Sequence, residues 1–391
     1  MTLRREGRRG RLAIGFALIG SAATVVALAA PAQAQEGEIL LAGSPDAVEG
    51  SYIVVLKDGS RSQSAEVAHN YGGKVRATYE SSIKGFSATM SESQARKLAA
   101  DDAVEFVQAN QKIRALDVQP NPPSWGLDRI DQADLPLDKS FTYSGKADNV
   151  TAFVIDTGVQ ADHPALGGRV SGGFDAVDND DKPEDEHGHG THVAGTIGSA
   201  EYGVAKGVKI VPVRVLDAQG SGTTEGVIAG IDWVAKNHQG PSVANMSLGG
   251  GADEALDKAV RAAIESGVTF AVAAGNSSDD AGNSSPARVP EALTIAASDN
   301  ADKQAEFSSF GKVVDLYAPG VDITSAWIGG ETKTISGTSM ATPHVAGAVA
   351  LYLAANPDAT PSAVAEAITA AATKDKIGGI SPDTVNLLLK A

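Results

Sequence analysis

The chain has 391 residues, of which 42% are hydrophobic and 20% charged, a composition typical of folded rather than disordered proteins. Acidic residues outnumber basic ones by 48 to 32, and the resulting formal charge of -16 argues against a nucleic-acid partner. The acidity favours solubility, and cation binding at acidic loops is compatible with it. There are no cysteines, which excludes disulfides, thiol nucleophiles and cysteine-ligated metal sites.

The N-terminus has the pattern of a secretory signal peptide. Arginines between positions 4 and 11 precede an apolar run over 12–30, and Ala32-Gln33-Ala34 is a small-x-small cleavage site. We therefore expect residues 1–34 to be removed and the product to be extracellular. A membrane anchor is the alternative, since the run is nearly long enough to span a bilayer, but the polar residues after Ala34 favour cleavage. Whether export uses the twin-arginine route stays open.

Residues 36–49 show no clear periodicity, and we expect them to be a spacer. Between about 51 and 115 the pattern predicts a small α+β domain in the order βαββαβ, which is that of a ferredoxin-like domain. Gly72 and Gly73 end its first helix. Ser91 and Gln94 form a capping box that begins its second helix.

Three prolines, Pro120, Pro122 and Pro123, make 116–126 an expected linker or cleavable junction. After it, apolar runs at 151–158, 209–217, 242–250, 268–276 and 292–299 alternate with helical patterns at 224–238 and 253–267. Continuous hydrophobicity in these runs predicts an α/β domain whose mostly parallel sheet is covered on both faces. Ligands bind such sheets beyond the carboxyl ends of their strands, where Asp156 and Asn276 fall.

The segment 186–196 places His187, His189 and His192 within a few residues of one another. Three imidazoles at this spacing, with Asp185 nearby, are compatible with a zinc site. Alternatively, one histidine is a general base and the others are scaffold or surface. The zinc hypothesis leaves the remaining motifs of the chain unexplained, and a helix over 191–197 would carry His192 away from His189.

Ser339 lies between small residues just before a predicted helix, whose N-terminal field favours a developing oxyanion. A serine hydroxyl is a poor nucleophile unless a base takes its proton, and the base needs a group to orient it. A histidine between Ser339 and Asp156 meets both needs. Asn276, at another strand end, is a suitable donor for the oxyanion.

The ordered motifs VIDTG, HGTHVAGT, NMSLGG, AAGN and GTSMATPHVAG resemble the subtilisin-like serine proteases, most closely the branch of proteinase K and aqualysin. The resemblance covers 125–391 and implies the subtilisin-like three-layer sandwich. It also implies a triad of Asp156, His189 and Ser339, with Asn276 and the N–H of Ser339 as the oxyanion hole. Three short segments correspond to the substrate-binding walls: Gly220, Ser221 and Gly222; Ser247, Leu248 and Gly249; and Ala273, Ala274 and Gly275.

The same resemblance implies a secreted serine endopeptidase that works through an acyl-enzyme. The pocket walls are uncharged, and no Asp or Glu is apparent among them, so broad specificity with hydrophobic or aromatic P1 residues is implied. The unit before residue 118 resembles the family's inhibitory propeptide, which implies a self-processing precursor cleaved in cis near 115–118. We expect the mature form, 118–391, to be a monomer that binds protein and peptide substrates and no membrane.

Among the histidines, the resemblance makes His189 the base and leaves His192 and His344 as scaffold. His187 stands where close relatives usually carry a small polar residue, and we expect it to be exposed. A binding-only relative without activity is a further alternative, but such proteins normally lack a catalytic residue, and none is missing here.

Calcium is the ion that the resemblance implies, because hard oxygen ligands suit it. The first expected site uses the backbone carbonyls of Pro290 and Ala292 with the carboxylate of Asp315. The second uses Asp128, Asp131, Gln132 and Asp138. The third is the acidic loop 178–185. For each site the alternative is a solvated acidic loop.

Overall fold

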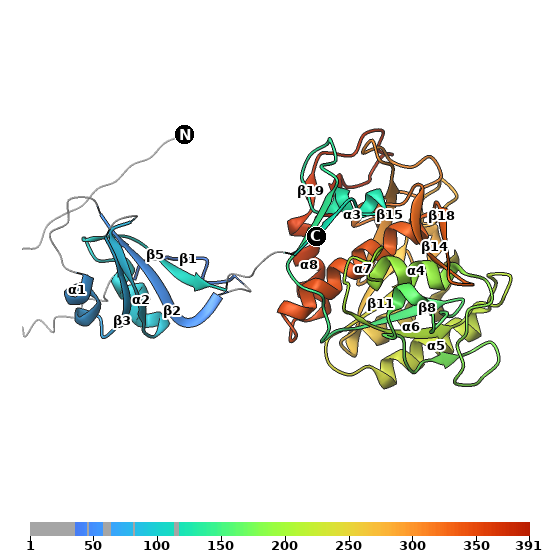
Figure 1. The fold of residues 1–391 in the computed structure, drawn as a ribbon, viewed down its shortest axis with the longest axis horizontal. Helices are drawn as coiled ribbons and strands as arrows, with labels where there is room; N and C mark the ends of the chain where they lie inside the picture. The colour runs from blue at the N-terminus through green and yellow to red at the C-terminus, as the bar shows by residue number, and fades with distance from the viewer. Residues whose placement is uncertain (1–35, 45–46, 58–63, 81–82, 113–116) are drawn as a thin grey trace, which may run out of the picture. The chain divides into compact units, whose positions relative to one another are not determined.

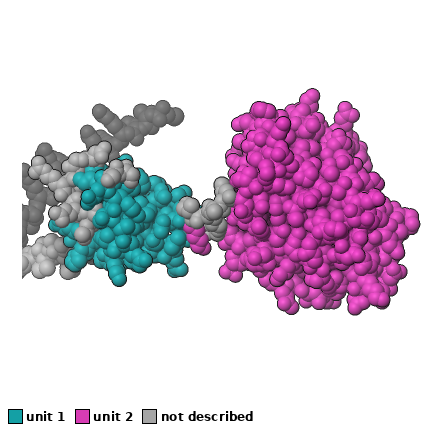
Figure 2. Space-filling model, viewed as in Figure 1, with its two compact units in different colours: residues 1–111 teal, residues 112–391 magenta. Residues whose placement is uncertain are grey.

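The computed structural model describes residues 36–44, 47–57, 64–80, 83–112 and 117–391. These residues divide into two compact units, split between Gln111 and Lys112 (Figure 2). The expected signal peptide and the Ala32-Gln33-Ala34 site lie outside the described residues. No described helix is both long and apolar enough to cross a membrane.

The first unit has the predicted ferredoxin-like order, with one strand added at its edge. Its sheet runs β1-β5-β2-β4-β3, and β1 pairs in parallel with β5 while the other pairs are antiparallel. The predicted capping box of Ser91 and Gln94 is confirmed. The elements are β1 (Ile39–Leu40), β2 (Ala47–Leu56), α1 (Ser64–Asn70), β3 (Lys74–Tyr79), β4 (Gly85–Thr89), α2 (Glu92–Ala99) and β5 (Val104–Gln111).

The spacer prediction for 36–49 is wrong for the part that forms β1 and the start of β2. Ile39 is 5% exposed and joins the core of the first unit, and Gly37 N–H donates to the Arg96 carbonyl at 2.8 Å. Two residues are too few to show an alternating pattern, so this strand had no signal in the sequence. The folded unit therefore begins before residue 51.

The second unit contains the predicted three-layer α/β sandwich. Its main sheet runs β19-β20-β16-β15-β13-β11-β8-β10-β9, and every pair from β20 to β9 is parallel. The strands are β8 (Thr151–Asp156), β9 (Phe174–Asp175), β10 (Lys209–Arg214), β11 (Ser242–Met246), β13 (Thr269–Ala273), β15 (Leu293–Ser298), β16 (Leu316–Pro319), β19 (Thr373–Lys374) and β20 (Leu387–Leu388).

Helices cover both faces of this sheet, as predicted. One face packs on α4 (His189–Gly198), α7 (Thr338–Ala355), α8 (Pro361–Ala371) and α3 (Trp125–Ile130), and α4 and α7 touch each other (Figure 1). The other face packs on α5 (Thr224–Asn237) and α6 (Glu254–Glu265). Alternate residues of β8 serve the two cores, since Ala152 and Val154 face the first and Phe153 and Ile155 the second.

Smaller elements complete the unit and correct the linker prediction for 116–126. Asp117–Pro120 is not a free linker but strand β6, paired antiparallel with β7 (Ser140–Tyr143). The proline pattern indicated extended backbone, and only the distant partner strand shows that it is paired. The other elements are β12 (Gly250–Gly251), β14 (Ser284–Ser285), β17 (Ile323–Trp327), β18 (Glu331–Ile335) and the 3-10 turns Pro164–Leu166 and Ala281–Asn283.

Candidate active site

A strand of the main sheet and a helix packed on that sheet meet at an acid–base pair. Asp156 closes β8 and is fully buried, and His189 is the first residue of α4. Oδ1 of Asp156 lies 2.7 Å from Nδ1 of His189 and also accepts the Thr157 N–H at 2.7 Å. Oδ2 of Asp156 is buried with no hydrogen-bond partner among the described residues. The pair leaves Nε2 of His189 without a hydrogen bond in the described structure and directed away from the carboxylate.

The charge balance around His189 favours its protonated form. Burial alone would lower the pKa of this imidazole, but the carboxylates of Asp156 and Asp185 outweigh that effect and hold the pKa above its usual value. The His189 side chain still has 20% of its surface exposed. It is therefore a histidine oriented by a carboxylate and open to a ligand on its other side.

Ser339 stands in the first turn of α7, beside a strand end of the same sheet. Its Oγ donates to the Ser247 carbonyl at 3.1 Å, and Ser247 Oγ donates to the Ser339 carbonyl at 2.8 Å. This reciprocal pair ties the serine to the loop after β11. In the described structure the Ser339 hydroxyl is therefore bonded to Ser247 and not to His189.

Asn276 is oriented by the start of the same helix. Its Oδ1 accepts the Thr338 N–H at 2.8 Å and the Thr338 hydroxyl at 2.9 Å. Because the oxygen takes both donors, the amide nitrogen is the free end of the side chain. Thr338 was not singled out in the sequence, although its place beside Ser339 would have justified it.

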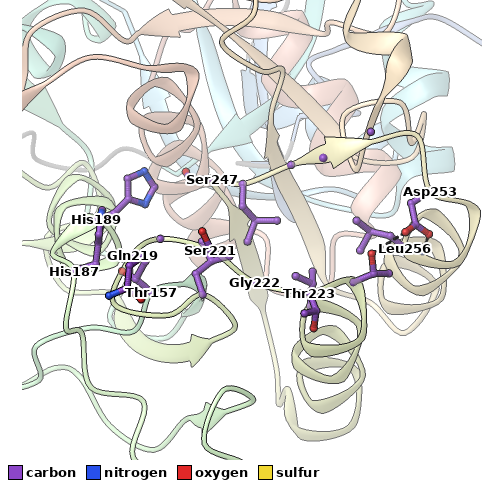
Figure 3. Close-up of a pocket in the computed structure, with 18 of the residues that line it drawn as sticks. Thr157, His187, His189, Gln219, Ser221, Gly222, Thr223, Ser247, Asp253 and Leu256 are labelled. Carbon is purple, nitrogen blue, oxygen red and sulfur yellow. Dashed lines mark hydrogen bonds between the residues drawn. The ribbon is translucent and has the colours of Figure 1, made fainter.

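Two cavities large enough for substrate lie beside these residues, and they share one wall. The first cavity, of about 690 Å³, is lined by His189, the predicted Gly220, Ser221 and Gly222, and the predicted Ser247, Leu248 and Gly249. Figure 3 shows His187 and His189 at one end of it and Asp253 and Leu256 at the other. The second cavity, of about 420 Å³, is lined by Ser339, Asn276, Ala273, Ala274 and Gly275, and Leu248 and Gly249 belong to both.

One sequence expectation about these walls needs correction. Asp279 also lines the second cavity, so an acidic residue is present there. It is exposed, and its Oδ1 accepts the Ser309 hydroxyl at 2.7 Å. The buried part of the lining is apolar, because Ala273, Ala274 and Ala287 are each less than one-tenth exposed. Asp279 lies three residues after the AAGN motif, 273–276, so the motif itself gave no indication of this carboxylate.

The other histidines have separate surroundings. His192 is fully buried, and its Nε2 lies 3.1 Å from the carbonyl oxygens of Ile323 and Lys333, so this nitrogen carries the proton. Burial lowers the pKa of His192 to about 4. Burial likewise lowers the pKa of His344 to about 4, and its Nδ1 bonds to the Met340 carbonyl at 2.8 Å.

These bonds argue against a zinc cluster, because Nε2 of His192 donates its proton to two carbonyl oxygens and is not free to bind a metal ion. Among the described residues, no group of three or more His, Asp or Glu side chains is placed to hold a metal ion.

His187 is not exposed as expected but half-buried. It lines the first cavity, and its ring centroid lies 6.3 Å from that of His189 and 6.2 Å from that of Trp327. Trp327 comes from β17, far along the chain, and it fills the space beside Gly188. The contacts that Trp327 makes have no local signal in the sequence.

The expected calcium ligands differ in how well the structure gathers them. Asp315 is half-buried, accepts the Thr294 N–H at 2.7 Å, and forms no ion pair within the described residues. Burial raises its pKa to about 6. Thr294 is two residues from Ala292 and Asp315 N–H donates to the Thr294 carbonyl, so the carboxylate is near the predicted carbonyl ligands. A buried carboxylate without a cationic partner fits a bound cation.

The second and third sets are less favourable. Asp128 accepts the Asp138 and Lys139 N–H groups, and Asp131 accepts the Thr142 N–H. Gln132 Oε1 accepts the Asp138 N–H at 3.2 Å, so backbone donors occupy much of this set. Asp128 and Gln132 share the Asp138 N–H, but the three carboxylates do not form a group placed to hold a metal ion in the described structure, so this calcium site stays a prediction.

In the third set, Arg214 already neutralises part of the acidic loop. Its guanidinium bonds to Asp175 at 3.0 Å, Asp178 at 3.3 Å and Glu186 at 2.7 Å. The loop 178–185 is therefore tied to an internal cation at its first residue, which weakens the case for a metal ion there.

The chain is similar to known proteins in both of its units. A sequence model described as the subtilase family, peptidase S8, matches residues 147–384, and one described as peptidase inhibitor I9 matches 51–116. The "Extracellular serine proteinase" of Thermus sp. (strain Rt41A) is 45% identical over 92% of this chain and 93% of its own length. The "Alkaline serine exoprotease A" of Vibrio alginolyticus is 46% identical over 87% of this chain and 67% of its own.

A solved structure is also similar. The crystal structure of a cold adapted subtilisin-like serine proteinase superposes with a TM-score of 0.67 at 56% identity, covering 68% of this chain and 97% of the other.

Proposed function

Because this chain belongs to the subtilase family and is a subtilisin-like serine endopeptidase with an inhibitor-type unit before it, we propose that Asp156, His189 and Ser339 carry out its reaction. The observation that carries this proposal is the 2.7 Å bond from the Asp156 carboxylate to Nδ1 of His189, which leaves Nε2 free on the open side. This is the orientation that a general base needs.

The reaction begins when Ser339 turns from Ser247 toward His189. Nε2 of His189 takes the hydroxyl proton while Oγ attacks the carbonyl carbon of the scissile bond. The imidazolium that forms is stabilised by Asp156, and it then returns the proton to the leaving amine as the acyl-enzyme forms. Water repeats the sequence to release the acid. The hydrogen bond between a catalytic serine and its base commonly forms or tightens only when substrate is bound. The bond from Ser339 to Ser247 in the free protein is therefore compatible with this step.

Two donors are available for the oxyanion of the tetrahedral intermediate. The free amide nitrogen of Asn276 is one, since its oxygen is held by Thr338. The N–H of Ser339 is the other, because the first N–H groups of a helix have no intrahelical acceptor. Donors held in place before the reaction stabilise developing charge without reorganising.

The two cavities divide substrate recognition between them. We assign the Gly220, Ser221 and Gly222 edge to pairing with extended substrate backbone, a β-augmentation mode. The second cavity, with its buried alanines beside Ser339, takes the P1 side chain. Its apolar depth favours hydrophobic or aromatic P1 residues, and Asp279, which is exposed, lies outside that buried part.

The first unit serves as the propeptide of a secreted precursor. Residues 1–34 are the signal peptide, and the inhibitor-type unit ends at a cleavage site near 115–118, of which 115 and 116 lie outside the described residues. The mature enzyme, 118–391, acts outside the cell as a monomer. The name of the Thermus relative, an extracellular proteinase, and the signal-peptide pattern support export.

Calcium is proposed as a structural ion at Asp315 with the carbonyls of Pro290 and Ala292. Its charge would compensate a carboxylate that burial otherwise makes costly to ionise. The ion takes no part in the chemistry at Ser339.

The deciding experiment compares the wild-type precursor, expressed without residues 1–34, with Ser339→Ala. Intact mass follows self-cleavage, and a peptide with an aromatic P1 residue reports activity. We expect the wild type to shorten near 115–118 and to be silenced by a phenylmethylsulfonyl-type reagent, while Ser339→Ala stays long and inert. A mature, active Ser339→Ala would remove the serine from its proposed role, and an inert wild type would favour a binding-only protein.

A further inference from the structure

A second carboxylate lies beside the base, and the triad chemistry does not use it. Asp185 precedes α4 and is only 9% exposed, a position that carboxylates rarely occupy without strong compensation. In the sequence it was considered only as a metal ligand, for zinc beside the histidines or for calcium as the last residue of the loop 178–185. Within the described residues it forms no ion pair with Lys, Arg or His, so its negative charge is not cancelled by a neighbouring cation.

Asp185 binds the backbone on both sides of the base. Its Oδ1 accepts the His187 N–H at 3.0 Å, the Gly188 N–H at 2.8 Å and the Thr157 hydroxyl at 2.8 Å. Its Oδ2 accepts the N–H of Thr191 at 2.9 Å and the hydroxyl of Thr191 at 2.6 Å. These five donors satisfy both oxygens of a carboxylate that is almost fully buried.

These bonds replace a cap that the helix lacks. The N-cap of α4 is Gly188, which has no side chain to accept the first N–H groups. Asp185 accepts the N–H of Thr191 instead, and Thr157 Oγ1 accepts the N–H of Gly190 at 2.9 Å while donating to Asp185. Thr157 directly follows Asp156 in the chain, so one network joins the carboxylate end of β8 to the first turn that carries His189.

The charge of Asp185 also acts on His189. Burial disfavours the imidazolium, and Asp156 followed by Asp185 opposes burial and raises the pKa of His189. Other charged or titratable groups also lie on the elements around the base. They are Glu186 paired with Arg214, His187 and His192 before and within α4, His344 on α7, and Lys333 over the Trp327 ring.

We propose that Asp185 is a positioning residue for the general base: it anchors the first turn of α4 and, as a second anion, favours the imidazolium formed when Ser339 gives up its proton. The inference rests on the proposed role of His189. Asp156 orients the ring through Nδ1, whereas Asp185 holds the backbone from which the ring projects. Removing Asp185 therefore affects both the geometry and the basicity of His189.

The test is the pH dependence of kcat/KM for Asp185→Asn, which keeps the side-chain shape and loses the charge. The unprotonated His189 is the active base, so a lowered pKa extends activity to lower pH. We expect kcat/KM at the plateau to fall roughly tenfold, since small displacements of catalytic groups are costly. On the acid limb of the pH profile, where kcat/KM rises with pH, the ratio of variant to wild-type activity should be about threefold higher than on the plateau at higher pH.

Two controls separate charge from anchoring. Asp232→Asn removes an exposed carboxylate paired with Lys236 on α5 and should leave the acid limb unchanged. Thr191→Val removes a donor to Asp185 but keeps the charge, so its plateau should fall while its acid limb stays in place. A merely structural role would lower the melting temperature of Asp185→Asn and Thr191→Val without moving either acid limb.

An acid limb of Asp185→Asn that coincides with that of the wild type would overturn the charge role, and an unchanged plateau would overturn the anchoring. If Asp185→Asn does not fold, Asp185→Glu replaces it. This variant keeps the charge on a longer side chain and should lower the plateau alone, and a plateau equal to the wild type would overturn the proposal. The proposed triad is judged separately, from inhibition of the wild type by the serine reagent and from Ser339→Ala.

Discussion

Gly188→Ala probes how the protein holds the residue before its base. Gly188 has φ +108, a left-handed conformation that costs other residues about 1–2 kcal/mol. A Cβ there would lie 2.3, 2.5 and 2.8 Å from the Cε2, Cζ2 and Cδ2 atoms of Trp327. The indole cannot move away freely, since it packs on His187 and His192 and lies under the Lys333 ammonium at 4.0 Å. Overpacking of this kind costs about 1–3 kcal/mol.

Adding the two terms gives a destabilisation of about 2–5 kcal/mol, which corresponds to a fall in Tm of roughly 4–20 °C for a domain of this size. Melting is measured in the Ser339→Ala background at one scan rate, because self-digestion would otherwise obscure the transition. In the active background we expect kcat/KM to fall by about tenfold or more, because Gly188 directly precedes His189.

Gly168→Ala is the matched control for the backbone term. Gly168 has φ +70, and a Cβ there would meet nothing within 4 Å, so only the left-handed cost of about 1 kcal/mol should appear. Replacing Trp327 by Leu in the Gly188→Ala protein should recover the steric part alone. Equal Tm values for Gly188→Ala and Gly168→Ala would refute the reasoning, because the Trp327 contact would then have no energetic effect.

Three further outcomes are expected. Chelation by EDTA should lower the Tm above pH 6 and have little effect below it, because the pKa of Asp315 is raised to about 6 and its carboxylate binds a cation only when ionised. The Tm of the Asp315→Asn protein should not respond to EDTA. A wild-type melting curve unchanged by EDTA would contradict the calcium proposal. The pKa of His344 is lowered to about 4, so the free energy of unfolding should decline as pH falls from 6.5 toward 4, by about 3 kcal/mol from this group. Denaturant titrations at several pH values should give the wild type a steeper decline than His344→Gln. Equal declines in the two proteins would contradict this prediction. Asn276→Ala should lower kcat roughly 10²- to 10³-fold with little change in KM, a size already known for loss of this donor in subtilisin; a change confined to KM would show that Asn276 binds substrate instead.

Much of the fold was predictable because it depends on local patterns. The apolar runs that became β8, β10, β11, β13 and β15 are continuous over their lengths, and the helices between them have clear periodicity, so propensity and burial agree. The proposed catalytic residues were found for a related reason. Asp156, His189, Asn276 and Ser339 each lie in a short motif at a strand or helix end, where the chain itself places the side chain near the carboxyl edge of the sheet.

Tertiary structure decided the features that depend on distant partners. Strand β6 is recognisable only through its pairing with β7, and Ile39 only through the core it enters. The burial of His187 depends on Trp327, which arrives from another part of the chain. The five bonds to Asp185 come from three neighbouring residues and from Thr157, the residue after β8, and no pattern in the sequence indicates them. Local sequence therefore determined which groups are available for chemistry, while non-local packing decided how each is held and charged, because burial and electrostatic environment depend on every element that surrounds a residue.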